Sequence, residues 1–136
     1  MFDKILKVFS AIIEFSNLHT IEAAYHLHRL GELKGGSDHQ DKNWAKFEGK
    51  SGVYCIFDSE GEKLKYIGMS QSDTGSRLFQ WLFPKTEIEL HEVQQAVKDD
   101  ENTLILSIAL PSHDYMAPAL ESFLIEKLKP ELNKKA

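Results

Sequence analysis

Two short runs of β-forming residues, separated by a turn, constrain the fold of this chain more than any other feature. The runs are Gly52–Phe57 (GVYCIF) and Lys63–Ile67 (KLKYI). Between them, Ser59-Glu60-Gly61 fits a hairpin loop of three residues with the glycine in the left-handed conformation. In that register Tyr54 lies opposite Tyr66 on one face of the hairpin, and a loop one residue longer would separate the two tyrosines.

After the hairpin, the chain alternates between predicted helices and one further strand. We expect a short helix over 77–83 and a longer one over about 87–98. The mostly apolar run 103–110 predicts a buried strand, and a last helix spans about 117–129. The order β-β-α-α-β-α predicts an α+β fold in which helices back a small sheet.

Apolar residues at helical spacing predict two helices in the first part of the chain. The first covers 2–16, and the second covers about 20–33. A polar connector follows over 35–50. We therefore divide the chain into an N-terminal helical extension with its connector, 1–49, and a second domain, 50–136.

Cysteine and histidine placement argues against a disulfide framework and against a zinc site. The chain has 136 residues and one cysteine, Cys55, so no internal disulfide can form. His26 and His28 are two residues apart on an expected helix and therefore lie on different faces. No stretch is long and apolar enough for a membrane span and no signal peptide is recognisable, so we expect a cytoplasmic protein.

Glu121 is the least explained residue of the last predicted helix. Its neighbours three and four residues away are all apolar: Ala117, Pro118, Leu124 and Ile125. A carboxylate in such surroundings needs a partner, because a buried unpaired charge costs several kcal/mol. It is either a glutamate at the edge of the apolar stripe, reaching water or a salt bridge, or a metal ligand or catalytic carboxylate.

Three more residues have both a structural and a functional interpretation. Tyr54 and Tyr66 are typical strand residues that can simply pack together, or they can take part in a site. Arg77 begins a predicted helix. Its guanidinium can stack on Trp81 or bind a phosphate, and it suits both roles.

In chain order, these residues resemble the GIY-YIG nuclease family. The matching elements are Gly52-Val53-Tyr54, Tyr66-Ile67-Gly68, Arg77, Glu121, and Pro130 with Asn133. The resemblance covers residues 52–133 and leaves the first 50 residues outside. It implies a three-stranded antiparallel sheet flanked by helices, and hydrolysis of DNA phosphodiester bonds with one divalent metal, Mg²⁺ or Mn²⁺.

The resemblance also implies catalytic roles. Glu121 would hold the metal, a hard cation that prefers oxygen ligands. Tyr54 would act as general base toward the attacking water or orient it, and Tyr66 would position the water or the phosphate. Arg77 would neutralise charge that develops on the phosphoryl oxygens.

Supporting positions follow from the same resemblance. Asn133 would organise the glutamate end through its amide, and Gly68 would allow close backbone approach. Many family members carry a histidine or tyrosine one turn after the arginine, where this chain has Trp81. His91 on the next helix is a candidate substitute, although the charge pattern of that helix explains it equally well. The expected DNA-binding residues are Lys65, Arg77 and Lys127.

The net charge of the chain has to be judged together with the positions of the GIY-YIG-like motif residues. The formal net charge of −5 argues, taken alone, against a nucleic-acid partner. However, residues 51–136 carry the whole acidic excess, and their acids gather at 87–101, away from the motif. The charge therefore does not exclude DNA, and it predicts weak non-specific affinity that fades quickly with salt.

Three functions remain open from the sequence. The first is a GIY-YIG endonuclease acting on DNA in repair, recombination or mobile-element biology. The second, favoured by Trp81 and the acidic balance, is a catalytically weak or inactive member that binds a DNA structure or a protein. In the third, residues 1–33 form a dimerisation or partner-docking element, because exposed apolar stripes on two helices need burial.

Overall fold

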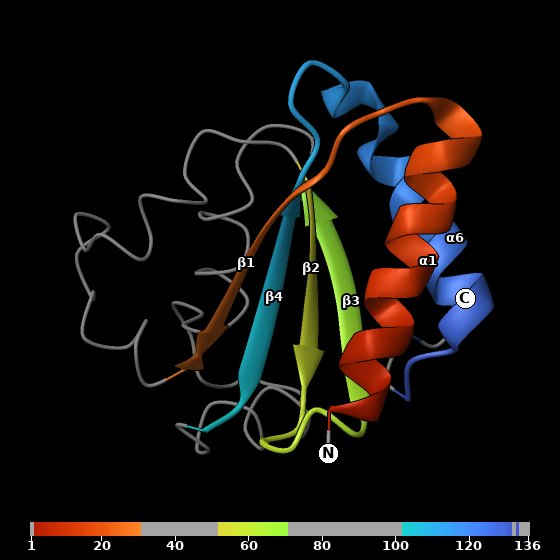
Figure 1. The fold of residues 1–136 in the computed structure, drawn as a ribbon. Coiled ribbons are helices and arrows are strands. Elements are labelled where there is room, and N and C mark those ends of the chain that lie inside the picture. Colours follow the sequence, from red (N-terminus) through yellow and green to blue (C-terminus); the bar gives the residue numbers. More distant parts are fainter. Residues whose placement is uncertain (1, 31–51, 71–101, 132, 134–136) are drawn as a thin grey trace, which may run out of the picture.

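The computed structural model describes residues 2–30, 52–70, 102–131 and 133 (Figure 1). Its elements are α1 (Asp3–His19), β1 (Ala24–Arg29), β2 (Gly52–Phe57), β3 (Leu64–Ser70), β4 (Leu104–Ala109), a 3-10 helix (Asp114–Met116) and α6 (Ala117–Leu128). Within these ranges, no helix combines the length and the apolar character needed to cross a bilayer. The helices expected over 77–83 and 87–98, and the connector over 35–50, lie outside the described residues.

The strands form one antiparallel sheet in the order β1-β4-β2-β3. The α+β class is confirmed, as are the first helix, both hairpin strands, the strand after residue 103 and the last helix. The expected sheet of three strands is wrong, because β1 adds a fourth strand beside β4.

β1 replaces the helix that the sequence predicts over 20–33. Residues Ala24–Arg29 pair along β4, and their side chains alternate, so that Leu27 is exposed while His28 is buried. The apolar spacing in this segment fits a helix, but the segment also carries a strand-like alternation. Pairing along β4 satisfies main-chain groups and buries one set of side chains, and this tertiary gain outweighs the helical pattern.

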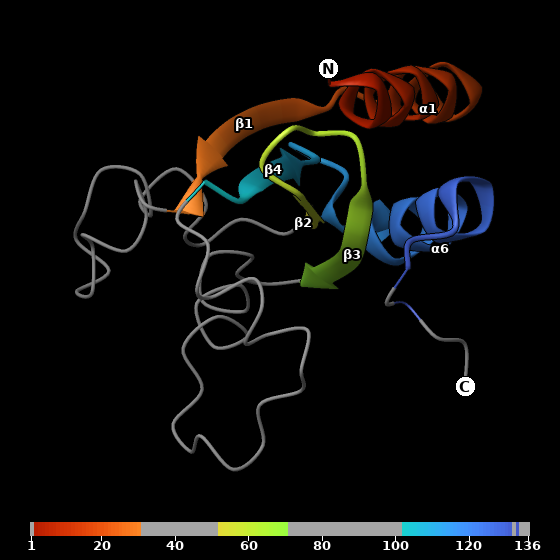
Figure 2. The same cartoon turned by 90° about the horizontal axis from the view of Figure 1, so that it is seen from below.

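Both helices cover one face of the sheet (Figure 2). They share a single core with that face, contributed by Ile5, Val8, Ala11, Ile12 and Phe15 of α1, Val53, Cys55 and Phe57 of β2, Leu64 and Ile67 of β3, Leu104, Leu106 and Ile108 of β4, and Ala117, Leu120 and Leu124 of α6. Burial raises the pKa of the Cys55 thiol far above its ordinary value, as expected for a core cysteine. The first thirty residues and the segments after residue 52 thus share one sheet and one core.

The β2–β3 loop holds the start of α1. The N–H of Phe2 donates to the carbonyl oxygen of Glu60 (2.9 Å), and the N–H of Lys4 donates to that of Gly61 (3.1 Å). These bonds satisfy donors that a helix start leaves unpaired. Gly61 has a φ of 68°, as predicted, and a β-carbon there would lie 2.6 Å from Cδ1 of Ile5. Glycine is therefore needed both for the turn and for the docking of α1.

The hairpin has a different register from the expected one. Tyr54 pairs with Gly68 and Ile56 pairs with Tyr66, with an irregularity after Ile56. The predicted pairing of Tyr54 with Tyr66 is therefore wrong by two residues, because the loop is longer than three. A shift of two keeps every side chain on its face. Tyr54 and Tyr66 consequently remain diagonal neighbours, with ring centroids 6.3 Å apart.

Candidate functional site

The two motif triplets lie on adjacent strands, β2 and β3. In the first triplet, Gly52 pairs with Ala109 of β4, and a β-carbon at Gly52 would overlap the carbonyl oxygen of Ile108. Val53 points into the core shared with the helices. Because side chains alternate along a strand, Tyr54 points to the opposite face of the sheet. The close approach of β4 thus explains why position 52 is a glycine, and burial in the core explains why position 53 is a valine.

Tyr54 and Gly68 fit each other directly. Tyr54 is 1% exposed, and a β-carbon built on Gly68 would overlap Cζ and the hydroxyl oxygen of Tyr54. The phenol therefore occupies the space that any other residue at position 68 would fill. Tyr66 lies beside it and is only half-buried. Of the two tyrosines, Tyr66 is the more accessible to a ligand.

Asn133 binds the middle residue of the second triplet. Its Nδ2 donates to the carbonyl oxygen of Ile67, and its Oδ1 accepts from the N–H of Ile67, each at 2.7 Å. The N–H of Glu131 donates to the carbonyl oxygen of Leu64 at 3.3 Å. β3 is the last strand of the described sheet, so these bonds occupy its outer edge. We expected the amide at the glutamate end, whereas both of its polar atoms bind β3.

Replacing Asn133 with aspartate should lower the free energy of unfolding by about 1–3 kcal/mol. The Nδ2 donor is lost, and a carboxylate oxygen then faces the carbonyl oxygen of Ile67. Urea unfolding of the full chain measures the change. Glu131→Ala is the matched control, because it alters an exposed side chain in the same segment and keeps its main-chain bond. Equal stability of the two variants would show that the amide contributes nothing.

Glu121 comes from α6, which packs over the other face of the sheet. The sheet-facing residues of that helix are Ala117, Leu120 and Leu124. Its flank toward α1 carries Phe123, whose ring centroid is 5.3 Å from that of Phe15. Glu121 lies about half a turn from Phe123, on the flank turned away from α1, and it is half-buried. The structure thus brings the two tyrosines and Gly68 together on one face of the sheet, whereas Glu121 lies on α6, which packs against the other face.

The donor chemistry of Glu121 fits a hard divalent cation. Mg²⁺ usually keeps several waters and is bound through one or two carboxylates, so a half-buried glutamate at the rim of a helix is a suitable ligand. Among the residues that the structure describes, no three His, Cys, Asp or Glu side chains gather into a metal site.

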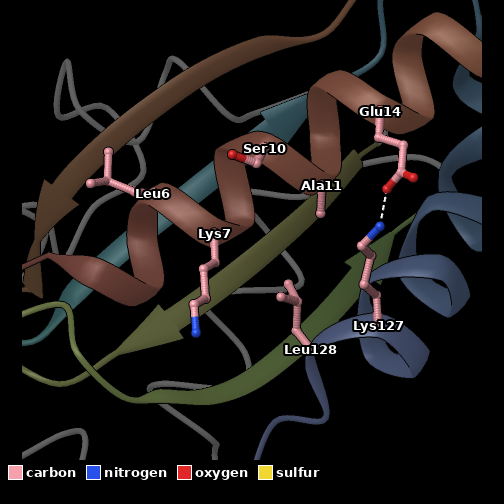
Figure 3. A pocket seen from close by; sticks show the side chains of 7 residues that line it. All are labelled: Leu6, Lys7, Ser10, Ala11, Glu14, Lys127 and Leu128. Atoms are coloured by element: carbon pink, nitrogen blue, oxygen red, sulfur yellow. Dashed lines mark hydrogen bonds and ion pairs between the residues drawn. The ribbon is translucent and has the colours of Figure 1, made fainter.

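The expected basic residues differ in their surroundings. Arg77 and His91 lie outside the described residues, and Lys65 is half-buried on β3. Lys127 is exposed on α6, forms an ion pair with Glu14 of α1, and lies 5.4 Å from the ring centroid of Phe123. Figure 3 shows this ion pair in a groove of about 510 Å³ between the two helices. The structure therefore gives Lys127 a partner that joins α6 to α1.

The structure adds two histidines to the face that carries Tyr54. Sequence reasoning placed His26 and His28 on different faces of a helix, whereas on β1 they share one face, because a strand repeats every two residues. His26 pairs with Ser107 of β4, and Ser107 pairs with Tyr54. The alternation of Tyr, His, Leu, His and Arg over 25–29 is the sequence signal that could have identified them.

Comparisons with known proteins assign no family to this chain. No protein-family model matches its sequence, and no curated protein matches it. A function for the chain therefore rests on its motif residues and on their arrangement.

Proposed function

We propose that the chain is a metal-dependent endonuclease that hydrolyses DNA phosphodiester bonds by the single-metal GIY-YIG mechanism. The observation that supports this most is the fit between the two triplets. The ring of Tyr54 lies over Gly68, and Tyr66 is its neighbour. Asn133 is hydrogen-bonded to Ile67, the residue of β3 between Tyr66 and Gly68. A repair, recombination or mobile-element role is consistent with this chemistry.

In this proposal each residue acts from its own element. Glu121 on α6 would hold Mg²⁺ or Mn²⁺, which when bound would supply Lewis-acid stabilisation at the scissile phosphate and the leaving oxygen. Tyr66, the more accessible tyrosine, positions the attacking water or the phosphate from β3. Tyr54 takes the proton of that water or orients it. A phenol loses its proton near pH 10 in water, so a nearby cation must favour its ionised form. Arg77 supplies the positive charge for the phosphoryl oxygens.

A second candidate function is a catalytically weak or inactive module that binds a DNA structure or a protein. The observation that favours it is the burial of Tyr54, which is 1% exposed and packs its hydroxyl end against Gly68. A tyrosine held in this way can serve the packing of the sheet alone.

DNA cleavage with and without metal tests the proposal. The purified chain is incubated with supercoiled plasmid and with branched DNA in Mg²⁺ or Mn²⁺, and in parallel with a chelator. We expect nicked or linear products with metal and none with chelator. If no substrate is cut under any condition while branched DNA is still bound, the proposal is wrong and the binding module is supported. Cleavage that persists in chelator would contradict the metal mechanism.

A further inference from the structure

Four large apolar residues form an exposed surface where α1 meets β1. They are Leu6 and Ile13 of α1, exposed by 61% and 54%, and Tyr25 and Leu27 of β1, exposed by 37% and 44%. The ring of Phe9, between Leu6 and Ile13 on the helix, packs edge-on against Tyr25 at 5.2 Å. We call these four residues the α1–β1 surface. Both elements contribute to it on the helix-covered side of the sheet.

Within the described sheet, the edge of β1 that faces away from β4 is unpaired, and it lies beside this surface. The N–H of Leu30 donates to the carbonyl oxygen of Thr103, so the antiparallel alternation points the N–H and C=O of Tyr25 and Leu27 away from β4. Among the described strands, none pairs with that outer edge. A strand edge flanked by exposed apolar side chains is a template for another strand.

The charge of the same region is compatible with a second copy of the chain. Residues 2–30 are balanced, with Lys4, Lys7 and Arg29 against Asp3, Glu14 and Glu22, whereas the chain as a whole carries −5. This region therefore brings no net charge of its own to an interface between two copies. An antiparallel edge strand can pair with its own copy across a two-fold axis, which is the commonest symmetry of protein dimers.

We propose that the chain forms a two-fold dimer through the α1–β1 surface, with β1 paired antiparallel to β1 of the second copy. The pairing places Tyr25 next to Leu27 of the partner subunit and joins the two sheets. It also lays the two α1 helices antiparallel, with Leu6 facing Ile13 of the partner subunit. Exposed contiguous apolar patches rimmed by polar residues mark protein interaction sites, and a specific interface buries about 1,000 Å² or more in total. The dimer does not depend on the proposed nuclease activity.

Sedimentation equilibrium of the full chain over a range of concentrations tests the dimer. The parent chain should have a two-chain mass at tens of micromolar, and Leu27→Lys should weaken association at least tenfold. Leu18→Lys is the matched control, because Leu18 is exposed by 67% but lies outside the surface. Circular dichroism confirms that each variant is folded. A parent chain that stays monomeric at 100 μM, or equal weakening by Leu18→Lys, would overturn the proposal.

Amide hydrogen exchange locates the interface independently. In the dimer, the outward N–H groups of Tyr25 and Leu27 are hydrogen-bonded to the second copy. Their protection should therefore rise with protein concentration, while the amides of β2 stay unchanged. A two-chain mass without this change in β1 would show that the copies meet elsewhere, and the proposed pairing would be wrong.

Discussion

Replacing Glu121 with alanine should reduce metal-dependent DNA cleavage to background. The substitution removes the carboxylate that is proposed to hold the metal, and without the metal neither the scissile phosphate nor the leaving oxygen would be stabilised. Losing one preorganised electrostatic contact costs about 10²–10³-fold in rate, and losing the ligand of the metal costs at least as much. The fold should survive, because Glu121 is half-buried at the rim of α6 and outside the apolar core.

Plasmid cleavage and Mn²⁺ binding together measure this effect. Glu126→Ala is the matched control, since Glu126 is an exposed glutamate on the same helix. We expect the control to cut DNA and to bind Mn²⁺ like the parent chain, and Glu121→Ala to do neither. If Glu121→Ala loses cleavage but retains Mn²⁺ affinity, another group holds the metal. If it cleaves like the parent chain, Glu121 has no part in the reaction.

Replacing Gly68 with alanine should both destabilise the fold and impair cleavage. The added methyl group would overlap Cζ and the hydroxyl oxygen of Tyr54, and Tyr54 has little room to move because it is 1% exposed. Overpacking of this kind costs about 1–3 kcal/mol of unfolding free energy. The displaced phenol should lower the cleavage rate by at least tenfold, because small errors in position at a reacting centre are costly.

A double-mutant cycle separates this contact from other effects of the alanine. Tyr54→Leu removes the ring, and in that background Gly68→Ala should cost at least 1 kcal/mol less than in the parent chain. Urea unfolding of the four chains gives the coupling energy. Equal costs in both backgrounds would mean that a neighbour other than Tyr54 excludes a side chain at position 68.

The elements that the sequence predicted correctly are those whose side-chain pattern has only one interpretation. α1 has a regular apolar stripe, α6 ends at Leu128 with Lys129 as its C-cap just before Pro130, and β2 and β3 flank an obvious turn. The hairpin register could not be fixed in the same way, because an even shift leaves each side chain on the same face. The tyrosines therefore met as expected even though their pairing was wrong.

β1 was missed because the apolar residues of this segment fit both the helical period and the strand period. Only the presence of β4 beside the segment decides in favour of a strand. That partner left a signal in the sequence. Residues 104–108 of β4 are all buried, on both faces of the strand. In the sequence they are apolar except for Ser107, and a nearly continuous apolar run is typical of a strand at the centre of a sheet. A three-stranded sheet with β4 at its edge does not explain this pattern. With Ala24–Arg29 as a strand, His26 and His28 lie on one face of the sheet, which is the face that carries Tyr54. A helix would have placed the two histidines on different faces.

The order of the strands also constrains when this chain can fold during synthesis. β4 is the last strand to leave the ribosome, yet it lies between β1 and β2, which do not pair with each other. Until residues 104–109 emerge, β1 lacks the strand with which it pairs in the described sheet, and its main-chain groups stay in water. Pairing of β1 with β4 also closes a long loop, which slows folding. A nascent chain that stalls before β4 therefore exposes β1 and α1 together, and it is in this state that the chain should depend most on chaperones.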